Sequence, residues 1–262
     1  MEGNKDLMLR KHLVTTAFAA ILFVTMSGMA YANPIVTYQI TPGQISTPTS
    51  NVTFSRTGLF ADVLRGINIS IDSLLGQGMG PSILRNCIGC TLEFTSGVGV
   101  TYAGAVGSPF NSETWTFASG GTAVIKGGVD LNSNGILDAG DITAGSTLLS
   151  GFFLNSPTVS RSSADHVLGA GLILNSQNQQ LNQYMFGQPL GGPIWTGSLS
   201  IRFNPGQYTA WTGGIPSFSS TVIVNGSLVN EVPEPNSGLI LLLSTGLLGI
   251  GLGLRRRANH NS

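Results

Sequence analysis

The stretch Leu199-Ser200-Ile201-Arg202-Phe203 alternates apolar and polar side chains, and this pattern decides the fold class. Successive side chains of a strand point to opposite faces, so alternation places one face in a core and the other in water. Residues 67–71 and 114–117 alternate in the same way. Shorter β-branched or aromatic runs occupy Ile35–Ile40 and residues 92–94, 98–102, 122–125 and 221–224. The chain is therefore predicted to be all-β.

Turn signals lie between these runs at Ser119-Gly120-Gly121, Gly127-Gly128, Gly191-Gly192-Pro193 and Asn225-Gly226. Asn-Gly favours a type I′ turn, so Asn225-Gly226 predicts a hairpin. Short strands separated by turns are typical of a β-sandwich or a β-barrel. We predict one antiparallel, jelly-roll-like sandwich over residues 33–231.

Three other segments lack a strand pattern. Residues 164–174 are compatible with a short helix, and Gln177-Asn178-Gln179-Gln180 is typical of a solvated loop. The Pro/Ser/Thr-rich residues 41–50 are predicted to be a flexible lead-in to the domain.

The composition points to the outside of the cell. Only 9% of residues are charged and 36 are glycine, whereas an average soluble domain has roughly 25% charged residues.

Between positions 33 and 234 there are six Lys or Arg against ten Asp or Glu. The chain therefore lacks the basic patch that nucleic acid would require, and nucleic acid is excluded as a partner.

The N-terminus has the pattern of an export signal. Lys5, Arg10 and Lys11 precede an apolar stretch at residues 13–26. Ala30 and Ala32 then supply the small side chains that signal peptidase requires, which predicts cleavage after Ala32. Residues 1–32 are thus interpreted as a signal peptide, with an uncleaved membrane anchor as the alternative.

The C-terminus has three consecutive parts. Val232-Pro233-Glu234-Pro235 precedes an apolar run at positions 238–254, and Arg255-Arg256-Arg257 follows. As a helix the run is about 26 Å long, near the lower limit for a membrane span. The arginines would keep the far end in the cytoplasm, which leaves the body of the protein outside.

This tail, residues 232–262, resembles the PEP-CTERM sorting signal in the order and spacing of its parts. The resemblance implies processing near Pro-Glu-Pro by a membrane-embedded exosortase of a Gram-negative bacterium. It further implies an inner-membrane intermediate, a final place on the cell surface or in the extracellular matrix, and an association with biofilm and exopolysaccharide. The alternative is an ordinary C-terminal anchor.

A candidate calcium loop spans Asp130 to Asp141. Its ligands would be side-chain oxygens at positions 1, 3, 5, 9 and 12 and a backbone carbonyl at position 7, with Gly135 at the sharp turn. In this sequence the ligands are Asp130, Asn132, Asn134, Ile136, Asp138 and Asp141. The loop resembles a dockerin calcium loop, although it occurs once and follows glycines where dockerins have a helix. The alternative is a turn without an ion.

Cys87 and Cys90 are the two cysteines of the chain. In an oxidising compartment the expected state is a disulfide that closes a small loop. A thioredoxin-like redox site would need a βαβ setting, which the pattern around them does not predict. Zinc is disfavoured because no His lies near them.

Catalytic candidates are few. His166 beside Asp165 lacks the nucleophile elbow of a hydrolase, and the spacing of Glu93 and Glu113 does not establish a glycosidase pair. We therefore expect no enzyme activity, with a secreted hydrolase as the third hypothesis.

The tryptophans are the candidates for a carbohydrate face. Trp115, Trp195 and Trp211 are expected in a β-core, or alternatively on a sugar-binding surface for which Trp195 and Trp211 are the best candidates. The leading hypothesis is a structural surface or matrix protein stabilised by calcium. The alternative is a carbohydrate-binding module or adhesin.

Overall fold

The structure is a computed structural model that describes residues 34–41, 43–44, 51–56, 61–78, 80–104, 113–162, 165–187, 195–204, 207–209 and 215–231. The predicted signal cleavage site at Ala30 and Ala32, the apolar run at 238–254 and the arginines after it lie outside these residues. Within the described ranges, no helix combines the length and apolarity needed to cross a membrane.

The described chain is almost entirely strand. In chain order its strands are β1 (Ile35–Ile40), β2 (Gly43–Gln44), β3 (Asn51–Ser55), β4 (Val63–Gln77), β5 (Ile83–Ala103), β6 (Thr114–Asp130), β7 (Ile142–Phe153), β8 (Thr158–Ser162), β9 (Asp165–Gln177), β10 (Trp195–Asn204), β11 (Gln207–Thr209), β12 (Ser217–Ser220) and β13 (Val222–Glu231). A helix of eight residues, α2 (Gln179–Phe186), lies between β9 and β10. The all-β prediction is confirmed.

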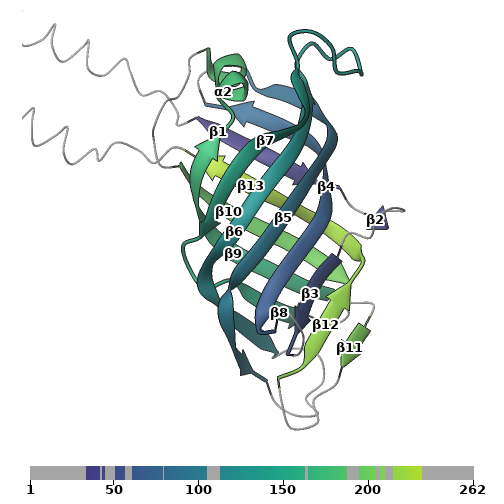
Figure 1. Cartoon of the computed structure of the whole chain (residues 1–262), viewed down its shortest axis with the longest axis vertical. Coiled ribbons are helices and arrows are strands. Elements are labelled where there is room, and N and C mark those ends of the chain that lie inside the picture. The colour runs from purple at the N-terminus through teal and green to yellow at the C-terminus, as the bar shows by residue number, and fades with distance from the viewer. Residues whose placement is uncertain are drawn as a thin grey trace, which may run out of the picture. The chain divides into compact units, whose positions relative to one another are not determined.

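Eight of these strands close into a barrel by antiparallel pairing (Figure 1). Round the sheet the order is β1, β13, β10, β9, β7, β6, β5 and β4, and β4 pairs with β1 to complete the circle. The predicted two-sheet sandwich is therefore wrong. Closure pairs the strand edges that an open sheet would leave exposed, and it needs strands long enough to wind round the barrel.

The chain enters and leaves the barrel at the same end. Ile35 at the start of β1 pairs with Glu231 at the end of β13, and also with Gln77 at the end of β4. Helix α2 lies at this end, which we call the α2 end (Figure 1). Short strands complete the opposite end, where β8 pairs with β6 and β9, and β3 pairs with β4 and β12.

Glycines that the sequence predicted as turns lie inside long strands. Ser119-Gly120-Gly121 falls in the middle of β6 and Gly127-Gly128 near its end. The runs at 114–117 and 122–125 are therefore one strand, and those at 92–94 and 98–102 are both part of β5. The turn predictions at these positions are wrong.

The physical reason is a β-bulge. Gly120 and Gly121 have φ angles of 88° and 72°, a region that other residues rarely adopt. The register of β6 shifts at this point against both β5 and β7. A Cβ on Gly121 would lie 2.1 Å from the carbonyl oxygen of Thr95 on β5. The bulge bends and twists the strand without ending it, as a barrel requires.

The predicted hairpin and the predicted helix at 164–174 are also wrong. Asn225-Gly226 lies within β13 and forms no hairpin, because both residues pair with β10, next to a register shift. Residues 165–174 of the predicted helix belong to β9, which pairs with β7, β8 and β10. Within the predicted flexible lead-in, Gly43–Gln44 forms β2 and pairs with β13. Gly191-Gly192-Pro193 lies outside the described residues.

The predicted solvated loop at 177–180 instead leads into α2. Gln177 is buried at the end of β9, and the Asn178 side chain caps the helix by accepting the backbone N–H of Leu181 at 3.0 Å. Gly187 ends the helix in the left-handed conformation, with φ 72°. The helix buries Leu181, Asn182, Met185 and Phe186.

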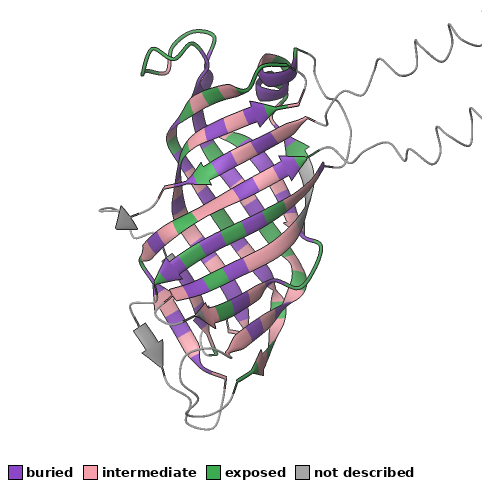
Figure 2. Ribbon diagram, turned by 180° about the vertical axis from the view of Figure 1, so that it is seen from behind, coloured by how far each residue is buried: buried purple, intermediate pink, exposed green. Residues whose placement is uncertain are grey.

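Apolar side chains fill the barrel interior, and the alternating pattern is visible along its strands (Figure 2). On β10, Leu199, Ile201 and Phe203 are buried, whereas Ser200 and Arg202 are exposed. The alternation of residues 199–203 predicts this pattern. Among the residues that the structure describes, the buried Phe, Tyr and Trp side chains are Tyr38, Phe54, Phe94, Trp115, Phe117, Phe153, Phe186, Trp195, Phe203 and Phe218. Burial of a side chain of the size of Phe stabilises the fold by about 1.5–3 kcal/mol, so this core dominates stability.

Candidate functional site

The loop between β6 and β7 brings the predicted calcium ligands close together at the α2 end. Asp130 is the last residue of β6, and Asp141 directly precedes β7. Both of these aspartates are buried, whereas Asn132, Asn134 and Asp138 are exposed. The strands thus fix the two ends of the loop, and its tip is in solvent.

Backbone N–H groups satisfy both buried carboxylates. Asp130 accepts from the N–H groups of Asn134 at 3.2 Å and Gly135 at 2.7 Å. Asp141 accepts from those of Leu131 at 2.8 Å and Asp138 at 3.0 Å. The bond from the Asp138 backbone is the main reason that the pKa of Asp141 is lowered, and burial opposes it. Asp141 is therefore ionised at neutral pH.

The two asparagines turn their amide nitrogens toward Asp138. Asn132 Nδ2 donates to Asp138 Oδ1 at 3.0 Å, and Asn134 Nδ2 donates to Asp138 Oδ2 at 2.6 Å. Calcium would need amide oxygens there, so both amides would have to rotate. In the part of the chain that the structure describes, no group of three or more His, Cys, Asp or Glu is arranged for a metal ion. The loop thus contains oxygen ligands of the type that calcium binds, but these oxygens are engaged in hydrogen bonds within the loop.

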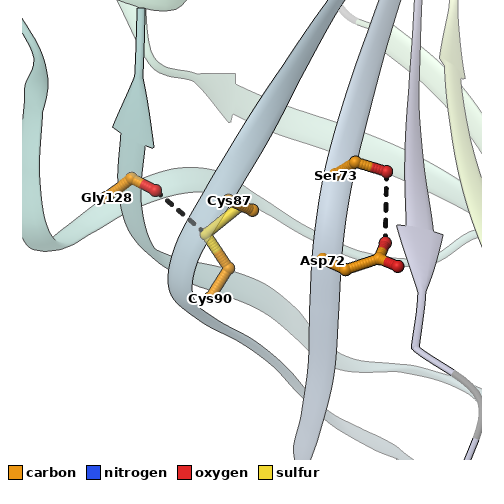
Figure 3. The surroundings of a disulfide bond; sticks show 5 residues. All are labelled: Asp72, Ser73, Cys87, Cys90 and Gly128. Atoms are coloured by element: carbon orange, nitrogen blue, oxygen red, sulfur yellow. Dashed lines mark hydrogen bonds between the residues drawn. A yellow bond between two sulfur atoms is a disulfide. The ribbon is translucent and has the colours of Figure 1, made fainter. Parts of the chain in front are cut away.

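A disulfide joins Cys87 and Cys90 close to Gly128, which lies two residues before the loop (Figure 3). Both cysteines are buried on the inner face of β5, with their Cα atoms 5.5 Å apart. Cys90 Sγ lies 3.3 Å from the carbonyl oxygen of Gly128, and a Cβ on Gly127 would lie 2.4 Å from the same sulfur. Gly127 therefore lets β6 pass against the disulfide, three residues before Asp130.

His166 is buried among aromatic rings near the end opposite α2. Its ring centroid lies 5.4 Å from those of Trp115 and Phe218 and 5.6 Å from that of Phe203. Burial, with a smaller contribution from Arg161, lowers the pKa of His166 to about 4. Asp165 instead accepts a hydrogen bond from Arg202 Nε at 2.7 Å. The adjacent Asp and His are thus engaged in separate packing and ion-pair contacts.

The two glutamates considered as a glycosidase pair lie far apart. Glu113 accepts from Tyr102 Oη and from Arg161, each at 2.7 Å. Glu93 is exposed on β5 and pairs with Val124 on β6. Glu113 directly precedes Thr114, the first residue of β6, and Val124 lies ten positions further along that strand. At 3.2–3.4 Å per residue that separation is roughly 30 Å, against about 5–10 Å in glycosidases.

The tryptophans proposed for sugar binding are core residues where the structure describes them. Trp115 and Trp195 are 0% and 2% exposed, and Trp115 Nε1 donates to the carbonyl oxygen of Pro216 at 2.9 Å. Trp211 lies outside the described residues. A stacking platform that includes Trp195 is therefore wrong.

The structure also buries polar residues that the sequence did not single out. Gln177, Asn182 and Asn230 lie inside the α2 end and are at most 7% exposed. No motif marks them, because each comes from a different element and burial alone distinguishes them.

The comparison with protein families identifies the C-terminal tail. A family model described as the PEP-CTERM protein-sorting motif matches residues 231–257. The match includes Val232, Pro233, Glu234, Pro235 and the three arginines, which lie outside the described structure. It confirms the predicted sorting motif and indicates an exported protein that an exosortase processes. No curated protein and no solved structure matches the chain.

Proposed function

We propose that this chain is a structural protein of the cell surface or extracellular matrix, without enzymatic activity, delivered by exosortase in an exopolysaccharide-producing Gram-negative bacterium. The observation that carries the proposal is the sorting motif at 231–257, which begins at the last residue of the last barrel strand. The matrix role rests on the resemblance of the tail to PEP-CTERM signals, which implies an association with biofilm and exopolysaccharide.

Both proposed processing steps leave the barrel intact. Signal peptidase would cut after Ala32, just before β1, and exosortase would act near Pro233-Glu234-Pro235, just after β13. Because Ile35 and Glu231 are paired, both cuts fall at the α2 end and remove no strand.

The surroundings of the catalytic candidates support a role without enzymatic activity. His166 packs against rings and Glu113 binds Arg161 and Tyr102. These contacts stabilise the end of the barrel opposite α2, and they leave His166 buried and neutral at physiological pH.

Contact with exopolysaccharide would use the hydroxyl-rich outer face of the barrel. Thr122, Ser198 and Ser200 are exposed, and Thr95 Oγ1 lies 3.1 Å from Thr122 Oγ1 on the neighbouring strand. Such a face offers many weak hydrogen bonds to a polar polymer, which suits a matrix component better than a module with one high-affinity ligand.

Calcium is retained in the proposal as a structural cofactor of the Asp130–Asp141 loop. Asp130, Asp138 and Asp141 would hold the ion with the oxygens of Asn132 and Asn134 and the carbonyl of Ile136. A bound calcium ion would offset two of the three negative charges that Asp130, Asp138 and Asp141 bring into one short loop. The chain's own contribution is to hold Asp130 and Asp141 at adjacent strand ends.

The sorting step can be tested by fractionating cells that carry Glu234→Ala or the triple change of Arg255, Arg256 and Arg257 to Ala. We expect unprocessed protein in the inner membrane for both variants, and mature protein in the matrix fraction for wild type and for Glu93→Ala, an exposed barrel residue. Normal maturation of the variants, or of wild type in a host without exosortase, would refute exosortase sorting.

The structural role can be tested on the matrix itself. Deleting the gene should weaken matrix cohesion, and both wild type and His166→Phe should restore it. Restoration by wild type alone, together with turnover of the polysaccharide, would indicate an enzyme instead.

A further inference from the structure

Three buried amides inside the α2 end carry unused hydrogen-bonding atoms. Gln177, Asn182 and Asn230 are 7%, 1% and 0% exposed. Asn230 Nδ2 donates to Gln177 Oε1. Among the described residues, Gln177 Nε2, Asn182 Oδ1 and Asn230 Oδ1 have no hydrogen-bond partner. Buried polar atoms are nearly always paired, so three such atoms at one end of a barrel require a physical explanation.

The strand register and the position of α2 place these amides at the same height along the barrel. Asn230 pairs with Val36 on β1, and Val36 pairs with Gly76 on β4. A Cβ on Gly76 would lie 2.6 Å from Met185 Sδ, so α2 lies directly against this level. Asn182 precedes Met185 by three residues and is therefore on the same buried face of the helix.

The unused groups of the Asn230–Gln177 pair do not depend on how its two amides are oriented. Flipping both amides of the Asn230–Gln177 pair, so that oxygen and nitrogen exchange places, reverses the hydrogen bond between them. The pair still has one unused NH₂ group and one unused carbonyl oxygen, because each amide has both functions. Asn182 contributes a further carbonyl oxygen.

The chemistry of this set selects a neutral hydroxyl group. Val36, Leu181 and Met185 are apolar and buried, and the three amides carry no charge, so this set of side chains offers no counter-ion to a charged ligand. A hydroxyl oxygen can accept from the Gln177 amide and donate to an asparagine oxygen, and water can donate to both asparagines. Tyr38, two residues from Val36 on the same face of β1, has a buried hydroxyl that also lacks a partner among the residues that the structure describes.

We propose that the α2 end of the barrel binds a neutral hydroxyl group between Gln177, Asn182 and Asn230. The group belongs either to an internal water molecule or to a small alcohol or sugar, and helix α2 covers it through Asn182. Internal waters in proteins typically make about three hydrogen bonds to such otherwise unpaired groups. The proposed site is independent of the sorting function.

The test is a crystal structure of the exported protein at a resolution that shows ordered water, with native mass spectrometry of the same sample, both prepared without glycerol or sugar. We expect electron density within hydrogen-bond distance of all three amides. A native mass equal to that of the polypeptide identifies the density as water, and an added mass identifies an organic hydroxyl compound. Amides that pair directly with one another or with backbone, without density between them, would overturn the proposal.

A variant pair adds a second readout. Asn182→Leu keeps a similar volume but removes one partner, so the density should disappear while α2 stays in place. Gln183→Leu, on the exposed face of the same helix, should retain it. Density that is unchanged in Asn182→Leu would contradict the proposed role of Asn182. The wild-type density and mass decide the main question even if the variant does not fold.

Discussion

Replacing Gly121 by alanine should destabilise the barrel far more than the same change at the adjacent Gly120. Both glycines have positive φ, 72° and 88°, so both alanines are strained. A Cβ on Gly120 would meet no atom within 4 Å. A Cβ on Gly121 would lie 2.1 Å from the Thr95 carbonyl oxygen and 2.6 Å from the carbonyl carbon of Ser96, both of which are backbone atoms.

Backbone strain and steric overlap both lower the free energy of unfolding, and the two effects can be estimated separately. Left-handed backbone costs an L-residue about 1–2 kcal/mol, which is the loss expected for Gly120→Ala. Gly121→Ala incurs the same strain, and in addition the backbones of β5 and β6 must separate. Forced overlap of this kind typically costs about 1–3 kcal/mol, which gives a total of roughly 2–5 kcal/mol. This is a large part of the 5–15 kcal/mol by which a typical domain is stable.

The assay is equilibrium urea unfolding of residues 33–231, followed by the fluorescence of the buried Trp115 and Trp195. We expect the urea midpoint to fall slightly for Gly120→Ala and strongly for Gly121→Ala, with an unchanged m-value in each case. Equal losses at the two positions would show that β5 and β6 do not approach each other at Gly121. In that case Ser119-Gly120-Gly121 would be an ordinary turn and the long, bulged β6 would be wrong.

Other predictions concern single groups. Burial lowers the pKa of His166 from 6.5 to about 4, so the unfolded chain binds more protons in that pH window. The contribution of His166 to the free energy of unfolding is complete above pH 6.5 and falls by about 3 kcal/mol as the pH is lowered to 4. Urea unfolding should show that His166→Phe removes this pH-dependent loss. Calcium at about 2 mM should raise the melting temperature by several degrees in wild type and Asp72→Ala but not in Asp130→Ala, and a wild-type curve unchanged by EGTA would exclude the ion. Replacing Cys87 and Cys90 by serine should lower the free energy of unfolding by about 2 kcal/mol, and free thiols at both positions in the exported protein would contradict the disulfide.

Fold class followed from the sequence because side-chain alternation is a local property. The stretch 199–203 lies in β10 with the predicted faces buried and exposed. The sandwich prediction failed because it treated glycines as chain reversals. Glycine permits both a turn and a bulge, and only the neighbouring strand decides between them. At Gly121 that neighbour is the Thr95 carbonyl, which belongs to β5 and is therefore outside the local sequence.

Helix α2 likewise depends on tertiary contacts that the local sequence does not indicate. Residues 177–180 are all Gln or Asn, so no apolar periodicity marks them as structured. The barrel provides the surface against which Leu181, Met185 and Phe186 pack, and tertiary burial overrides the weak local preference.

What the sequence determined by itself is the export address, the all-β class and the spacing of the Asp130–Asp141 loop and of Cys87 and Cys90. These are short linear patterns whose chemistry depends on adjacent residues. What only the tertiary structure decided is the closure of the sheet, the neutral state of His166 and the burial of Asn182 and Asn230 inside the α2 end. Each of these depends on residues that are distant in sequence, and on the loss of water around them when the barrel closes.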